Sequence, residues 1–136
     1  MDKIFDTNVL LSKWCHDRLW IEASDQAITR SARQLIDLYK TNLIVSPVEI
    51  ELLAGTRNKE ELRRMRIFLA EFIVADGGII TQNDLREAKR IAQRVPEKSR
   101  QLGYRRQLGD CLIRALCIRF GKDPISFDKY ERDWWN

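Results

Sequence analysis

The chain has 136 residues, a length that suits a single domain over 1–136 with a core of its own. Hydrophobic residues make up 44% and charged residues 32%, which excludes general disorder because this apolar content can offset the ordering entropy. Lysine and arginine number 24 against 20 acidic residues, a net charge of +4. No apolar run could span a bilayer and no secretory signal opens the chain, so we expect a cytoplasmic protein without membrane contact.

Few residues in this chain could supply histidine- or thiol-based chemistry. His16 is the only histidine, and the three cysteines lack the paired spacing of a zinc site. We expect these cysteines to be reduced and mostly buried. A catalyst built on this sequence would therefore have to work with carboxylates.

Hydrophobic periodicity divides the chain into short strands that alternate with amphipathic helices. Short apolar runs predict strands over 3–5, 43–45, either 73–75 or 78–80, and 124–127. Apolar residues at helical spacing predict helices over 7–15, 24–39, 46–55, from 58 onward, 81–95 and 110–120. The last of these helices is apolar on nearly all sides, so we expect it to be buried.

Capping signals indicate where three of these helices begin. Ser46 is placed to cap the third helix, with Pro47 at the first helical position and Glu49 closing a capping box. Asn58 with Glu61 repeats the start signal, and Thr81 with Asp84 starts another helix further along the chain.

Strands that alternate with helices predict an α/β fold with a mainly parallel sheet of four to five strands, covered on both faces. In such a sheet, the carboxyl ends of the strands and the starts of the following helices share one edge, where ligands bind. Five acidic residues fall at that edge: Asp6, Glu49, Glu51, Asp110 and Asp128.

Each of these acids also has an ordinary structural interpretation. Asp6 and Asp110 suit helix capping, and Asp128 suits a turn. Gathered at one edge, however, carboxylates repel one another and resist ionisation unless a cation joins them. Oxygen ligands without His or Cys suit Mg²⁺ or Mn²⁺, which can activate water and stabilise the charge of an attack on phosphorus. The convergence of the acids therefore favours a metal-dependent site.

Basic residues gather in one stretch of the chain. Between Arg86 and Arg106 there are eight basic residues and two acidic ones, and 97–108 has the composition of a polar basic loop. This stretch is either a solvated surface or a surface that contacts phosphate. Arg105 and Arg106 are the first candidates for RNA phosphate contact. Arg114 lies one helical turn after Asp110. Three roles stay open for it: orienting Asp110, forming an ordinary ion pair, or contacting phosphate.

Four motifs occur together in the order and at the spacing of a known family: Asp6-Thr7-Asn8, Glu51-Leu52-Leu53-Ala54-Gly55, Gly109-Asp110-Cys111-Leu112-Ile113-Arg114-Ala115 and Ser126-Phe127-Asp128. With them the chain resembles the PIN domain, and most closely the short VapC-type toxins of prokaryotic toxin–antitoxin pairs. The resemblance covers nearly the whole chain. It implies a three-layer α/β/α sandwich, Mg²⁺- or Mn²⁺-dependent RNA cleavage, homodimers and often a partner antitoxin.

The resemblance also implies roles for individual residues. Carried over position by position, the four metal-binding and catalytic acids are Asp6, Glu51, Asp110 and Asp128. The polar residues that hold acids or water in place are Thr7, Asn8 and Ser126. Glu49 stays open as an alternative to Glu51, and Ser126 replaces the threonine usual before the fourth acid. The chain continues only to 136, so we expect the family's usual last strand to be either missing or reduced.

The function predicted on these grounds is that of a metal-dependent RNA endonuclease, the toxin of a type II toxin–antitoxin pair. Two alternatives are a housekeeping RNA-processing nuclease and a non-cutting module that binds RNA or protein. The predicted partners are an RNA substrate, an antitoxin protein and a second copy of the chain.

Tryptophan is unusually frequent, with four residues at Trp14, Trp20, Trp134 and Trp135. Three interpretations stay open for them: core packing, an interface for self-association or for an antitoxin helix, and base stacking.

Overall fold

The computed structural model describes residues 2–94 and 104–127, with side chains from residue 109 onward in the second range. Its strands are β1 (Lys3–Phe5), β2 (Leu43–Ile44), β3 (Ile73–Val74) and β4 (Asp123–Ile125). Its helices are α1 (Thr7–His16), α2 (Asp25–Tyr39), α3 (Ser46–Ala54), α4 (Lys59–Leu69), α5 (Gln82–Ala92) and α7 (Tyr104–Phe120). The alternation of strands and helices is confirmed, and the third strand occupies the earlier of its two predicted positions.

The four strands of the described residues form two parallel pairs. β1 pairs with β4, with Ile4 opposite Pro124, and β2 pairs with β3, with Leu43 opposite Ile73. Parallel pairing is therefore confirmed, but in the described residues the pairs are not joined into the expected sheet of four to five strands. A side chain links them instead, since the Thr41 hydroxyl donates to the Lys3 carbonyl at 2.7 Å.

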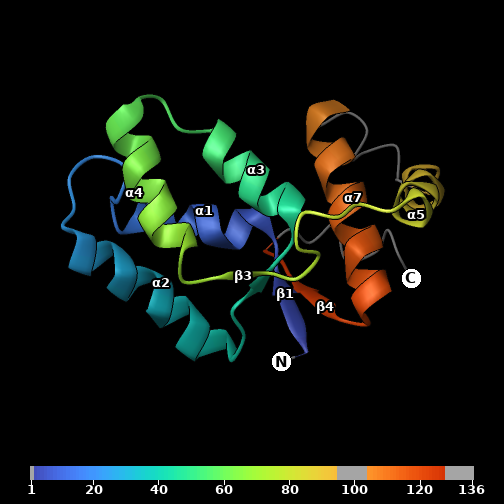
Figure 1. Ribbon diagram of the computed structural model, residues 1–136, viewed down its shortest axis with the longest axis horizontal. Coiled ribbons are helices and arrows are strands. Elements are labelled where there is room, and N and C mark those ends of the chain that lie inside the picture. The colour runs from blue at the N-terminus through green and yellow to red at the C-terminus, as the bar shows by residue number, and fades with distance from the viewer. Residues whose placement is uncertain (1, 95–103, 128–136) are drawn as a thin grey trace.

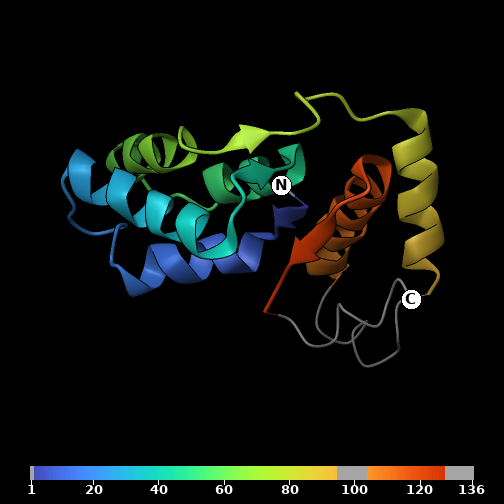
Figure 2. The same cartoon turned by 90° about the horizontal axis from the view of Figure 1, so that it is seen from below.

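The helices lie on the two sides of these strands (Figure 1). Helices α1 to α4 occupy one side of the molecule, and α5 and α7 occupy the other. Figure 2 shows α5 and α7 side by side, with β4 following the end of α7. The fully buried residues Ile4 and Phe5 of β1 lie in the main core, and the Phe5 ring meets Tyr39 and Phe72 edge to face at 5.6 Å. β1 is thus the central element of this mixed α/β fold.

Local signals account for most of the helix starts. The predicted capping box of α5 is present: the Thr81 amide donates to Asp84 at 2.8 Å, and the Asp84 amide donates to the Thr81 hydroxyl at 3.1 Å. Asn58 caps α4 through the Glu61 amide at 2.9 Å. Each of these caps satisfies an amide that has no partner within its own helix.

The predicted cap of α3 is wrong. Ser46 is the first residue of the helix, and Val45 in front of it makes no side-chain cap. The Ser46 amide donates to Asp76 Oδ1 at 2.8 Å, and the Ser46 hydroxyl donates to the other oxygen of the same carboxylate. Asp76 follows β3 and is buried, so the cap comes from a residue thirty positions away and not from a local box.

A second correction concerns the basic stretch before the buried helix. The sequence predicts a loop over 97–108, but α7 begins at Tyr104 and places Arg105 and Arg106 in its first turn. The rest of the predicted loop, 97–103, lies outside the described residues. The buried character of the helix is confirmed from Cys111 to Cys117, where only Leu112 is not fully buried.

Replacing Asp76 tests this long-range cap. We expect Asp76→Ala to lower the free energy of unfolding by about 1–3 kcal/mol, because it leaves the buried polar groups of Ser46 without their partner. Asp76→Asn should cost less, since its amide oxygen can still accept from the Ser46 amide. Urea denaturation measures both values, with Asp37→Ala on the exposed face of α2 as the control. An equal effect of Asp76→Ala and Asp37→Ala would contradict this assignment.

Candidate metal centre

Asp6 stands where β1 meets α1, and its carboxylate is 1% exposed. It is the N-cap of α1: Oδ1 accepts from the Thr7 amide at 2.7 Å. Oδ2 accepts from Arg114 Nη2 at 2.9 Å, in an ion pair whose two side chains are both buried. The capping role expected of an aspartate is therefore present, together with a charged contact that spans 108 positions in the sequence.

Arg114 brings α7 to the end of β1. Its side chain is 1% exposed, and it lies four residues after Asp110 on the same face of α7. A guanidinium this deeply buried is held by the carboxylate of Asp6 and does not present itself to solvent. Of the three roles considered for Arg114, the ion pair is present, with Asp6 as the partner, and the burial of the guanidinium argues against contact with RNA.

Glu51 reaches the same place from the second turn of α3. The pKa of its carboxyl is raised from 4.5 to about 7, first by burial and then by the negative charges of Asp110 and Asp6, against a smaller lowering by the Thr7 side chain. The three acids therefore interact electrostatically, although Asp6 precedes α1, Glu51 belongs to α3 and Asp110 belongs to α7. Glu49, two positions earlier, points to another side of α3 because residues two apart on a helix do not share a face.

Gly109 makes room for the Glu51 carboxylate. A Cβ built on Gly109 would lie 3.1 Å from Glu51 Cδ and would overlap Oε1. The glycine before Asp110 thus allows α3 and α7 to approach with an acid between them. This close approach gives a physical reason for the Gly-Asp pair in the sequence.

The supporting polar residues also meet. Asn8 Nδ2 donates to the Ser126 hydroxyl at 3.0 Å, and the Phe127 amide donates to Asn8 Oδ1 at 3.4 Å. These two bonds attach the segment after β4 to the first turn of α1. They lead the chain toward Asp128, which lies outside the described residues, so the fourth acid of the predicted set stays a prediction.

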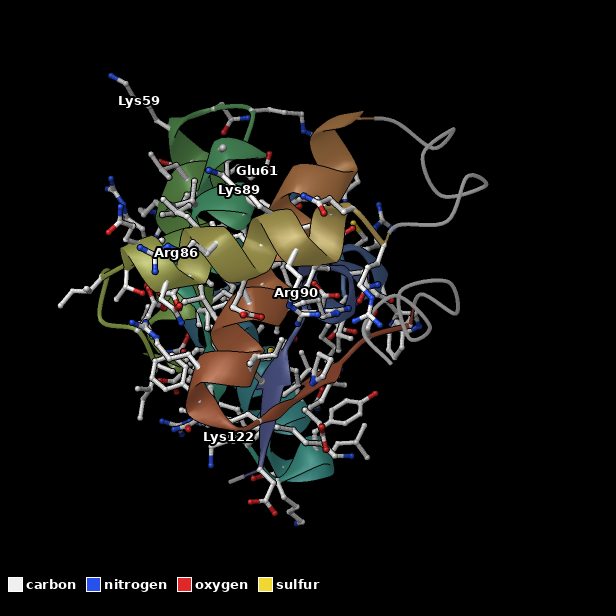
Figure 3. All side chains as sticks on the ribbon, turned by 90° about the vertical axis from the view of Figure 1, so that its right-hand side faces the viewer. Lys59, Glu61, Arg86, Lys89, Arg90 and Lys122 are labelled. Atoms are coloured by element: carbon white, nitrogen blue, oxygen red, sulfur yellow. The ribbon has the colours of Figure 1, made fainter. Side chains whose placement is uncertain are left out.

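The side chains of the two other basic candidates lie outside the described part of the structure. Arg105 and Arg106 belong to α7, ahead of Asp110, and only their backbone is described. Their predicted contact with RNA phosphate stays a prediction. The basic residues of α5 are described, and Figure 3 shows Arg86, Lys89 and Arg90 on the outer side of that helix.

Asp76 belongs to the same edge and was missed by the sequence analysis. It follows β3 as Asp6 follows β1, and it sets the start of the helix that carries Glu51. The available signal was an aspartate before Gly77 and Gly78, both of which have positive φ angles typical of a tight turn. Asp76 positions α3 through its contacts with Ser46.

A hollow of about 650 Å³ opens beside Glu51, and its wall is largely apolar. Thr7 and Glu51 are among its lining residues, together with Trp20, Arg57 and Glu61. Glu51, one of the three gathered acids, thus borders a cavity of the size that ligand sites commonly have.

No group of three acidic, His or Cys side chains in residues 2–94 and 104–127 is arranged to hold a metal ion as placed. The bond to Arg114 fixes Asp6, so a cation would require the carboxylates of Glu51 and Asp110 to turn toward it. The donor set is nevertheless suitable, because carboxylate oxygens are the ligands of Mg²⁺ and Mn²⁺. Burial is the largest cause of the raised pKa of Glu51, and the part due to Asp110 and Asp6 is a repulsion that a cation would relieve.

Comparison of the chain with family models, with curated proteins and with solved structures returned no match. Among the helices of the described residues, none has both the length and the apolar character needed to cross a membrane.

The pKa of Glu51 predicts how stability depends on pH. Because the folded state binds this proton more tightly than the unfolded state, the free energy of unfolding should fall as pH rises from about 4.5 to about 7. Glu51→Gln should remove this part of the dependence, and Mg²⁺ at pH 8 should stabilise the wild type more than the variant. Thermal unfolding at pH 5 and pH 8 measures both effects. Identical pH profiles for the two proteins would refute the crowding of charges at Glu51.

Gly109→Ala tests the close approach of α3 and α7. The added methyl group should displace the Glu51 carboxylate and weaken Mn²⁺ binding at least fivefold, as measured by titration calorimetry. Stability should not fall, because alanine is favoured over glycine in a helix by about 1 kcal/mol. In a Glu51→Ala background the same substitution should have no further effect on Mn²⁺ binding. A fivefold loss in that background too would mean that Gly109 acts in another way.

Proposed function

We propose that this protein is a divalent-metal-dependent endoribonuclease that hydrolyses RNA phosphodiester bonds. The observation that carries the proposal is the gathering of Glu51, Asp6 and Asp110, which the Asp6–Arg114 ion pair and the close approach of Gly109 to Glu51 bring together and whose charges raise the pKa of Glu51. One acid with a raised pKa could be a structural accident. Three acids gathered at the carboxyl ends of parallel strands are the arrangement expected of a cation-binding edge.

Each residue of the site would have its own role in RNA hydrolysis. Glu51 and Asp110 supply carboxylate oxygens, with Asp128 as the predicted fourth acid, and Arg114 holds Asp6 in a fixed orientation through their 2.9 Å contact. Asn8 and Ser126 keep the segment after β4 against α1. A divalent cation held by these acids would supply Lewis acidity and lower the pKa of a water molecule. The protein's own part is to gather the acids and to position the phosphodiester beside them.

The basic residues suit an anionic substrate. The outer side of α5 carries Arg86, Lys89 and Arg90, and Glu87 pairs with Arg90 at 2.9 Å. Such a surface attracts the phosphate backbone without reading its sequence, so binding should weaken as salt rises.

The proposal extends to the finer features that the PIN-domain resemblance implies. These are the three-layer α/β/α arrangement, the VapC-like role in a toxin–antitoxin pair, the antitoxin partner and the homodimer. A small antitoxin gene next to the gene for this chain would favour the toxin over a housekeeping RNA-processing nuclease.

A non-cutting binding module is the second candidate, and one observation favours it. Asp6 is engaged by Arg114, and no three potential ligands of the described chain are already arranged around a cation. A module that uses this ion pair only to hold α7 in place would keep the fold without the chemistry.

Cleavage of a mixed RNA pool decides between the two candidates. We expect the purified protein to cut RNA with Mn²⁺ or Mg²⁺ and to stop in EDTA. Asp110→Asn and Glu51→Gln should each lower the rate at least a hundredfold, since both remove an oxygen ligand without removing the Asp6–Arg114 pair. Asp37→Asn on α2 is the matched control and should cut like the wild type.

Two outcomes would contradict the nuclease. Equal cleavage by the wild type and by both site variants would identify a contaminating RNase. Absence of cleavage together with absence of Mn²⁺ binding would identify the non-cutting module.

A further inference from the structure

The hollow beside Glu51 is a candidate substrate subsite. It lies between α1, α3 and α4, and Thr7 and Glu51 are among its lining residues. A phosphodiester placed at Glu51 would have its neighbouring nucleotide close to this hollow, because consecutive nucleotides are joined through that phosphate. The hollow is therefore where a base next to that phosphate would lie.

Trp20 and Arg57 form the part of the wall best suited to a base. The Arg57 guanidinium lies over the Trp20 indole, with Cζ 4.6 Å from the ring centroid. The Trp20 carbonyl also accepts from Arg64 Nη1 at 3.4 Å, which helps to fix the residue. Both indole and guanidinium groups stack on nucleobases, and a cation held on an aromatic ring adds attraction for a nearby phosphate.

Glu61 supplies the hydrogen-bonding group of the hollow. Its side chain is 5% exposed, and its Oε2 accepts from both the backbone amide and Nε of Arg57 at 3.3 Å. Since both of these bonds use Oε2, Oε1 remains to accept from a ligand. A carboxylate oxygen accepts readily from the exocyclic amino group of adenine, cytosine or guanine. Uracil offers only its N3–H at this edge, between two carbonyl oxygens that a carboxylate repels.

We propose that this hollow binds the base of an unpaired ribonucleotide adjacent to the scissile phosphate, and that it prefers an amino-bearing base to uracil. The position of the phosphate rests on the proposed nuclease function. The base would contact the Trp20–Arg57 pair and donate its amino group to Glu61.

An RNA base fits these features better than an apolar peptide segment does. Glu51, which lines the hollow, belongs to the acids proposed to hold a cation beside phosphate, and Arg57, whose side chain is 64% exposed, supplies positive charge at the rim. A peptide that filled the hollow with apolar side chains would gain from Leu11 and Met65 but would offer no donor to Glu61 Oε1.

Oligonucleotide binding tests the subsite without depending on cleavage. The probes are fluorescein-labelled hexa-adenylate, hexacytidylate and hexauridylate, measured by anisotropy in Ca²⁺ with the full chain, with gel analysis to confirm intact RNA. We expect the adenylate and cytidylate probes to bind at least fivefold more tightly than the uridylate probe. Trp20→Ala should weaken adenylate binding at least tenfold, and Trp20→Phe should remain within threefold of the wild type.

A second variant, at Glu61, tests recognition of the base edge separately from stacking. Glu61→Gln should bring the adenylate and uridylate affinities within twofold of each other, because a carboxamide can both donate and accept. Arg57→Ala should weaken the binding of all three probes. Because the Arg57 side chain is exposed, this variant replaces Trp20→Ala in the test if Trp20→Ala does not fold. Leu38→Ala, 70% exposed on α2, is the control and should change nothing.

Each outcome separates the subsite from the nuclease function. Equal affinities for the three probes would overturn the subsite, and so would unchanged binding by folded Trp20→Ala and Arg57→Ala. Either result would favour a protein partner as the occupant of the hollow, even if metal-dependent cleavage is observed. Base preference without any metal-dependent cleavage would support the subsite as an RNA-binding site and refute the nuclease. Absence of binding by the wild type to all three probes would overturn the subsite.

Discussion

The buried ion pair between Asp6 and Arg114 is the interaction on which the arrangement of the acids depends. It joins the end of the central strand β1 to α7, two elements separated by 108 positions in the sequence. Both side chains are almost completely buried, so removal of either one should cost about 3–5 kcal/mol, because a buried charge loses the partner it contacts directly. With α7 held there, Asp110 and Gly109 lie one turn earlier in the helix, beside Glu51 of α3.

This constraint creates an electrostatic imbalance as well as a stable contact. Arg114 pairs with Asp6, while the negative charges of Asp6 and Asp110 also act on Glu51. They add to the effect of burial, which is the largest cause of the raised pKa of Glu51. The proposed cation would relieve this repulsion by supplying positive charge.

Much of this arrangement follows from local sequence, because periodicity and caps act over a few residues. The strand ending at Asp6, the box of Thr81 and Asp84, and the buried helix near Asp110 were all predictable in this way. The cap of α3 was not, since Asp76 reaches Ser46 across thirty positions. The choice of Arg114 as the partner of Asp6 and the approach of Gly109 to Glu51 likewise depend on packing between distant helices.

The location of a bound cation tests the account most directly. Mn²⁺ broadens the NMR signals of nuclei near it, so a substoichiometric titration of the ¹⁵N-labelled protein would map its site. We expect the amides of Thr7, Leu52 and Asp110 to broaden first, and the same amides to stay sharp in Glu51→Gln at equal Mn²⁺. Broadening centred on the exposed acids of α2, or absent at millimolar Mn²⁺, would contradict a metal centre at this edge of the fold.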